Sequence, residues 1–87
     1  MCRNITTLRG LEPVATDEEI EAAARQFVRK ISGVQKTSAA TEEAFERAVV
    51  AVTAASHELL ADLPPRKQPP RTEPPLRRIA ARAAAAG

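Results

Sequence analysis

The first candidate for chemistry in this 87-residue chain is Cys2, which directly follows Met1. Because cysteine is small, we expect the initiator methionine to be removed, which would leave a thiol beside a free α-amine. Such a thiol can act as a nucleophile with the amine as its base. The sequence shows no evident oxyanion hole, however, and its single histidine, His57, is expected on the polar, solvated side of a helix. We therefore predict no enzyme and no catalytic residues, with a thiol enzyme or thiol sensor as an alternative.

A second candidate is a group of basic and hydroxyl side chains between two predicted helices: Arg29, Lys30, Ser32, Gly33, Lys36, Thr37 and Ser38. A phosphate could bind here, since free N–H groups at the start of a helix attract anions. The carboxylates of Glu42, Glu43 and Glu46 crowd the same helix start and would repel it. A capped turn is therefore favoured over a phosphate site.

The remaining residue types give no sign of a metal, a cofactor or a base-stacking surface. One cysteine cannot form an internal disulfide or a cysteine-based zinc cage, and no second histidine accompanies His57. The two aromatic residues, Phe27 and Phe45, both fall on apolar helix stripes, so none is left to stack on bases. We predict no metal and no cofactor.

The elements that must position these residues begin with a helix over residues 16–33. Thr16 and Glu19 have the spacing of a capping box, and Gly33 can take the left-handed conformation that ends a helix. Acidic residues at its start and basic residues at its end suit the helix dipole. Its apolar positions recur with helical spacing: Ile20, Ala23, Ala24, Phe27, Val28 and Ile31.

A second helix is predicted over residues 41–63, opening at Thr41 and ending at Pro64 and Pro65, which remove two backbone donors. Its apolar seam alternates spacings of four and three: Phe45, Val49, Val52, Ser56, Leu59 and Leu63. Such a seam suits near-antiparallel packing against the first helix across the loop 34–40.

Two helices of this size need a cover for their apolar stripes, because a domain of about 60 residues buries only about 60% of its unfolded surface. The N-terminal arm carries Ile5, Leu8, Leu11 and Val14 and is predicted to pack across the helix pair. A homodimer that joins two hairpins into a four-helix bundle would bury the same surface, and both arrangements stay open. The predicted fold class is all-α: an antiparallel helical hairpin with a packed N-terminal arm.

The composition changes after Leu63. Six of the seven prolines form three pairs in the tail, at residues 64–65, 69–70 and 74–75. These pairs predict a stiff, polyproline-like linker within a C-terminal tail that is Pro-rich and mostly flexible. Beyond them, Leu76, Ile79, Ala80 and Ala83 form a weak stripe on an Ala-rich stretch and predict a short, transient helix. We therefore divide the chain into a helical domain, residues 1–63, and a basic tail, residues 64–87.

Charge is uneven across this boundary. Residues 1–63 carry a net charge of −3 and residues 64–87 a net charge of +5. The simplest interpretation is solubility, and nucleic acid or an acidic protein surface are the alternatives. No secretory pattern and no run of about 18 apolar residues is present, which predicts a cytoplasmic protein without a membrane partner.

Four blocks of the sequence resemble an uncharacterised bacterial family catalogued as domain of unknown function 2277. They are MCRNI at residues 1–5, EP at 12–13 with ATDEEI at 15–20, VRKISG at 28–33 and AFERAV at 44–49, so the resemblance covers about residues 1–63. It implies a small helical protein and no established activity. It also draws attention to motif residues that an apolar stripe does not need: Cys2, Arg3, Asn4, Arg29, Lys30 and Ser32.

The sequence thus predicts a small helical module for protein interaction or regulation, with a protein partner or a homo-oligomer. The candidate functional surface comprises Cys2, Arg3, Asn4, Arg29, Lys30, Ser32 and Lys36. The main alternative is a nucleic-acid accessory protein that binds phosphates through the interhelix loop and the basic tail.

Overall fold

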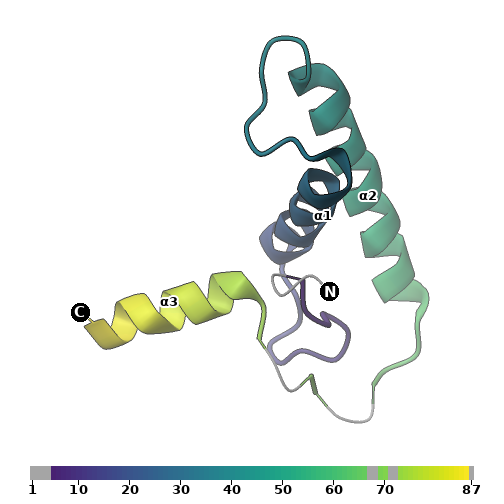
Figure 1. Cartoon of the computed structure of the whole chain (residues 1–87). Coiled ribbons are helices and arrows are strands. Elements are labelled where there is room, and N and C mark those ends of the chain that lie inside the picture. The colour runs from purple at the N-terminus through teal and green to yellow at the C-terminus, as the bar shows by residue number, and fades with distance from the viewer. Residues whose placement is uncertain (1–4, 67–68, 71–72, 87) are drawn as a thin grey trace.

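The chain folds into three α-helices, with no strand among the residues that the structure describes (Figure 1). The structure is a computed structural model and describes residues 5–66, 69–70 and 73–86. The helices are α1 (Asp17–Ser32), α2 (Glu42–Asp62) and α3 (Pro75–Ala86), and α1 and α2 pack against each other as an antiparallel hairpin. The predicted all-α hairpin is confirmed.

The ends of α1 form as their local signals predict. The Thr16 hydroxyl accepts a hydrogen bond from the Glu19 N–H at 3.2 Å, and the Glu19 carboxylate accepts one from the Thr16 N–H at 2.8 Å. At the other end Gly33 adopts φ 72° and donates its N–H to the Arg29 carbonyl. A residue with a side chain would be strained in this left-handed conformation, so the glycine ends the helix at low cost.

Helix α2 begins after Thr41, as predicted. Thr41 occupies the N-cap position, but its side chain makes no capping bond to the helix. Its hydroxyl instead accepts the Ser38 N–H at 2.9 Å, while the Ser38 carbonyl accepts the Glu42 N–H. Ser38 and Thr41 therefore close the turn before α2 together, and the carbonyl of Ser38 satisfies the first helical donor.

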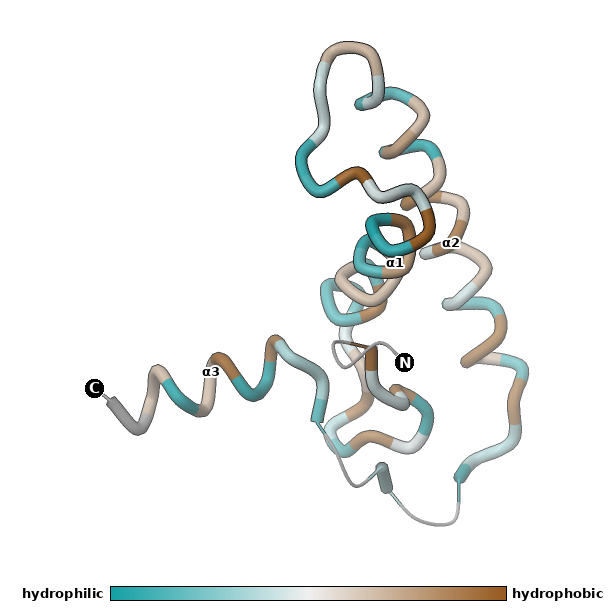
Figure 2. The backbone as a smooth tube through the Cα atoms, in the orientation of Figure 1, coloured by the Kyte–Doolittle hydropathy of each residue, from teal (hydrophilic) through white to brown (hydrophobic). Residues whose placement is uncertain are grey.

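The buried contact between α1 and α2 centres on Val28, Phe45 and Val49. On α1 the buried row is Ile20, Ala24 and Val28, spaced by four residues along one line of the helix. Figure 2 shows hydrophobic residues along α1 and α2 where the helices meet, with more on the second half of α2 and on α3. The core is narrow because α1 has a single partner helix.

This narrow core corrects the predicted stripes. Phe27 is 43% exposed and Ile31 is 69% exposed, although both share the helical spacing of the buried row. One partner helix covers a single row of side chains, so the residues beside that row and at the helix end stay in solvent. On α2 the seam is buried at Phe45 and Val49, whereas Leu59 and Leu63 are exposed.

The N-terminal arm lies at the end of the hairpin where α1 begins (Figure 1), and Val14, one of its four predicted packing residues, is 80% exposed. Leu11 is buried at 7% exposure, and Arg9 donates two hydrogen bonds to the carbonyl of Pro64, at 3.0 and 2.7 Å. These bonds join the arm to the segment that follows α2. Helix α3 then starts beside the arm and projects away from the hairpin, so most of its length touches no other element (Figure 1).

Candidate functional site

The predicted functional surface does not gather in one place among the residues described. Cys2, Arg3 and Asn4 lie outside the described residues. Lys30, Ser32 and Lys36 are exposed at the loop end of the hairpin. Arg29 stands apart from them, because it is partly buried and lines a cavity against the arm and the start of α3.

Ser32 has a local structural role. Its hydroxyl donates to the Val28 carbonyl at 2.6 Å and accepts the Val34 N–H at 3.2 Å. Val28 lies in the last part of α1, and Val34 lies in the turn that follows the helix. The side chain therefore helps to close the helix end, as serines near helix ends commonly do.

The interhelix loop and the basic helix α3 lie at opposite ends of α1 (Figure 1). The hydroxyls of Ser38 and Thr41 are 3.2 Å apart and pair with each other, and Lys36 is exposed. The two basic regions thus form two separate surfaces. A joint phosphate site across loop and tail stays a prediction from the sequence.

His57 lies closer to the body than its place on the polar side of α2 predicts. Its Nε2 is 3.5 Å from Oδ1 of Asp17, at the start of α1, and its side chain is 41% exposed. Within the described part of the chain, no three His, Cys, Asp or Glu side chains lie close enough together to hold a metal ion.

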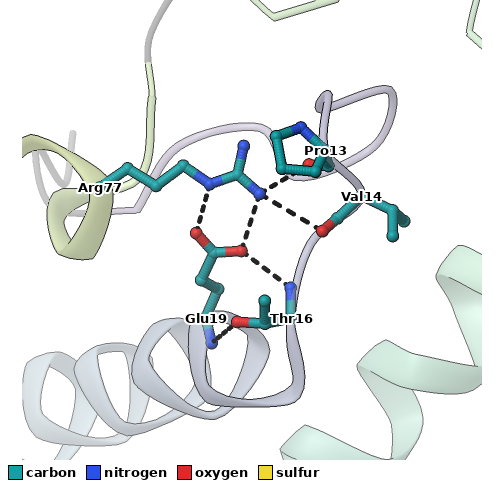
Figure 3. A network of polar contacts seen from close by, with 5 residues as sticks. All are labelled: Pro13, Val14, Thr16, Glu19 and Arg77. Carbon is teal, nitrogen blue, oxygen red and sulfur yellow. Dashed lines mark hydrogen bonds and ion pairs between the residues drawn. The ribbon is translucent and has the colours of Figure 1, made fainter.

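The most strongly connected polar group is the carboxylate of Glu19 (Figure 3). It is 5% exposed and accepts two hydrogen bonds from Arg77, from Nε at 2.6 Å and from Nη2 at 3.0 Å. The same Nη2 donates to the carbonyls of Pro13 at 2.6 Å and Val14 at 3.3 Å. Arg77 therefore ties the first turn of α3 to both the arm and the start of α1.

The electrostatics of this pair follow from its geometry. The hydrogen bonds from Arg77 hold the pKa of Glu19 below its ordinary value, against the effect of burial. In turn, the Glu19 carboxylate raises the pKa of Arg77. Both groups stay charged near neutral pH, and the parallel bonds fix the direction of the guanidinium. We call this pair the α3 latch.

The sequence gives no signal for this latch. Glu19 is recognised only as half of a capping box, and Arg77 only as one of several tail arginines. The two residues are 58 positions apart, and helical periodicity carries no information over that separation. The latch is therefore a tertiary feature that only the fold reveals.

A second polar cluster joins α1 to α2. Arg25 donates to both oxygens of Glu46, at 2.7 and 2.9 Å, and to Oε1 of Glu21 at 3.2 Å. Its guanidinium carbon lies 5.9 Å from the centre of the Phe45 ring, within the range of a cation–π contact. Arg25 lowers the pKa of Glu46, so this cluster is also charged near neutral pH. Its three charged groups carry a net charge of −1, and the charge of Arg29 also contributes to lowering the pKa of Glu46.

An open hollow of about 530 Å³ lies between the arm and the second half of α2, and we call it the arm cleft. Most of its wall is apolar, formed by Leu8, Leu11, Val14, Ile20, Leu60 and Leu63. Glu12, Asp17 and His57 bring polar groups to it, and Arg9 and Arg66 line the side of the tail. The exposed side chains Val14 and Leu63 belong to this wall, so part of it is apolar surface in contact with solvent.

A smaller hollow of about 200 Å³ lies on the other side of the arm, and we call it the tail cavity. Its apolar walls are Leu8, Ala22, Ala23, Pro74, Pro75 and Leu76, and Thr6, Gln26 and Arg29 add polar groups. The Thr6 hydroxyl oxygen is buried and has no hydrogen-bond partner among the described residues. Sequence reasoning names Arg29 but gives no signal for Thr6 or for the cavity, which forms only where three segments meet.

None of the helices described here is long and apolar enough to cross a membrane. A family model described as "Uncharacterized conserved protein (DUF2277)" matches residues 1–84, which extends the similarity through the Pro-rich segment and most of α3. No curated protein and no solved structure matches the chain.

Proposed function

The chain belongs to the DUF2277 family. For this member of the family, we propose that it is a small protein-interaction module that pairs with a second copy of itself. In the proposed pair, helix α3 of each chain lies in the arm cleft of the other. The observation that carries the proposal is the coexistence of an open apolar cleft and an unpartnered amphipathic helix in one chain.

The apolar stripe of α3 matches the apolar wall of the cleft. Leu76, at the root of α3, lines the tail cavity, and beyond it Ile79, Ala80 and Ala83 recur at helical spacing, with Ile79 61% exposed. An amphipathic helix that lies in a groove is recognised through anchors at this spacing. Burial of such side chains removes apolar surface from water, which favours association.

Charge favours the same pairing. Helix α3 carries Arg77, Arg78 and Arg82 and no acidic residue, whereas the body of the chain has a net charge of −3. Arg77 is engaged by Glu19 in its own chain, which leaves Arg78 and Arg82 exposed on the side away from the stripe. Glu12 and Asp17 line the arm cleft and supply carboxylates near an incoming helix, beside the cations of Arg9 and Arg66 on the side of the tail. Opposite charges at the rim steer association and fix orientation.

The α3 latch prepares the helix for this role. Because Arg77 is fixed to Glu19, Pro13 and Val14, the root of α3 is held while the rest projects from the body (Figures 1 and 3). A helix held in advance loses less conformational entropy on binding. Because each chain offers one helix and one cleft, the reciprocal exchange uses both in a dimer and leaves neither free to add a third chain. We expect a small interface with a dissociation constant in about the micromolar range.

The proposal is tested by the mass of the particle in solution. Sedimentation velocity over a range of concentrations is expected to show a monomer–dimer equilibrium for the natural chain. Ile79→Glu, at an exposed position of α3, is expected to give monomer at concentrations where the natural chain is dimeric. Val50→Glu is the matched control, because Val50 is 67% exposed on α2 and does not line the arm cleft.

A natural chain that stays monomeric at all accessible concentrations contradicts the proposal. So does a dimer that Ile79→Glu leaves unchanged. Salt gives a separate readout: association through apolar contacts persists as salt rises, whereas a phosphate-driven complex with nucleic acid would weaken steeply. The nucleic-acid and thiol-based functions remain predictions from the sequence, as does the cytoplasmic location.

A further inference from the structure

The tail cavity is walled by three segments that the sequence separates widely. The arm contributes Thr6 and Leu8, the outer face of α1 contributes Ala22, Ala23 and Arg29, and the root of α3 contributes Pro74, Pro75 and Leu76. Pro74 is buried, and the α3 latch holds this root in place. The cavity is therefore part of the folded body and does not depend on a second chain.

Most charges around the cavity are already paired. Glu19 is matched by Arg77, and Arg25 is matched by Glu46 and Glu21. Arg29, by contrast, forms no ion pair with any residue that the structure describes, although its charge contributes to lowering the pKa of Glu46. The buried Thr6 hydroxyl also lacks a partner there. Arg29, on the wall of a mostly apolar hollow, is thus a charged donor for which the described residues supply no ion-pair partner.

We propose that the tail cavity binds a small monocarboxylate with an apolar body of about four to six carbon atoms. The carboxylate lies on Arg29, whose planar fork matches two carboxylate oxygens. The apolar body lies among Leu8, Ala23 and Leu76. The size follows from the volume, because an apolar cavity of about 150 Å³ is enough for a benzene-sized molecule.

A single negative charge suits this site better than a phosphate dianion. Arg29 is the one cation on the cavity wall for which the described residues supply no ion-pair partner. A monoanion supplies Arg29 with one partner of opposite charge. A dianion would bring a further charge into mostly apolar surroundings without a partner, and burial of an unpaired charge is strongly unfavourable.

The direct test compares hexanoate with hexanamide, which has the same carbon chain and no charge. Titrations of the full chain are followed by two-dimensional NMR of the backbone amides. Hexanoate is expected to bind at least about tenfold more tightly than hexanamide, and its shifts should centre on Thr6, Ala22 and Ala23. This pattern separates the tail cavity from the arm cleft, where Leu60 and Leu63 would respond.

Arg29→Gln is expected to reduce hexanoate affinity to the level of hexanamide and to leave hexanamide binding unchanged. Lys30→Gln is the matched control, since it removes the same charge from the next, exposed position of α1. Ala23→Met, which fills the cavity, is expected to block both probes, and the helical circular dichroism of each variant confirms that it is folded.

Equal affinity for the two probes overturns the proposal, as does hexanoate binding that Arg29→Gln does not weaken. Absence of hexanoate binding at millimolar concentrations overturns it as well. This inference is independent of the proposed self-association, because the Ile79→Glu variant is expected to bind hexanoate as the natural chain does.

Discussion

Arg77 on α3 reaches back 58 residues to the buried carboxylate of Glu19, to which it donates hydrogen bonds of 2.6 and 3.0 Å. The single carboxylate of Glu19 therefore takes part in two structural contacts. It accepts the Thr16 N–H in the capping box of α1, and it holds the root of α3. The start of α1, the arm and the tail helix are thus joined at one point (Figure 3).

The first prediction concerns the latch itself. Arg77→Ala leaves the Glu19 carboxylate without its charged partner and is expected to lower the Tm by about 5 °C or more. Arg78→Ala is the matched control, because Arg78 is the next residue of the same helix and is exposed. Thermal unfolding by circular dichroism measures both. Equal Tm values for the two variants would show that the latch contributes nothing to stability.

The second prediction is a pH dependence. The pKa of Glu19 is lowered from its ordinary value of 4.5, chiefly by the hydrogen bonds from Arg77. A carboxyl group with a lowered pKa in the folded state stabilises the fold above its unfolded pKa, and this contribution is lost as the pH falls through the folded pKa. The natural chain should therefore lose Tm as the pH falls from about 5 through the lowered pKa of Glu19.

Glu19→Gln provides the comparison, because the amide cannot ionise. The pKa of Glu46 is also lowered, so some acid sensitivity will remain in this variant. The loss of Tm on acidification should nevertheless be smaller for Glu19→Gln than for the natural chain. Identical pH profiles would mean that Glu19 does not titrate as its contacts imply.

The third prediction separates the two phenylalanines. Phe45 is 6% exposed at the centre of the core, so Phe45→Ala is expected to reduce the free energy of unfolding by about 3 to 5 kcal/mol. Phe27 is 43% exposed, and Phe27→Ala should reduce it by about 1 kcal/mol or less. Urea titrations of the two variants decide this. A similar loss for both would indicate that Phe27 is buried in solution.

The fourth prediction concerns the link between α1 and α2. Arg25 bonds both oxygens of Glu46 and lies over Phe45, so Arg25→Ala is expected to lower the Tm by about 5 °C. Arg47→Ala is the control, since its bond to Glu43 lies on the surface with both side chains largely exposed. Such surface pairs contribute little, so its Tm should change by about 1 °C or less. Equal changes in Tm for the two variants would contradict a larger contribution of Arg25 to stability.

Local features of the fold could be predicted because their signals lie within one or two helical turns. The capping box of Thr16 and Glu19 and the stop at Gly33 are of this kind, and so are the limits of α2 at Thr41 and Leu63. The exposure of Phe27 could not be predicted, because helical spacing shows which side chains share a face but not how much of that face the partner covers.

The candidate site depends on contacts between distant segments and was largely beyond sequence reasoning. The sequence singles out Arg29 as a motif residue, yet its neighbours in the tail cavity come from the arm and from the root of α3. Closeness in sequence groups Lys30, Ser32 and Lys36 with it. The fold places them at the exposed loop end of the hairpin, away from that cavity.

The most direct test of self-association is an intermolecular relaxation measurement. A Cys2→Ser, Arg82→Cys chain carries a spin label on the exposed side of α3, away from its apolar stripe, and is mixed with an isotope-labelled natural chain. In the mixed dimer, the label should broaden the amide signals of Leu60 and Leu63 in the arm cleft and leave those of Lys36 and the rest of the interhelix loop sharp. Sharp signals throughout the arm cleft, at concentrations where sedimentation shows a dimer, would contradict the exchange of α3 between the two chains.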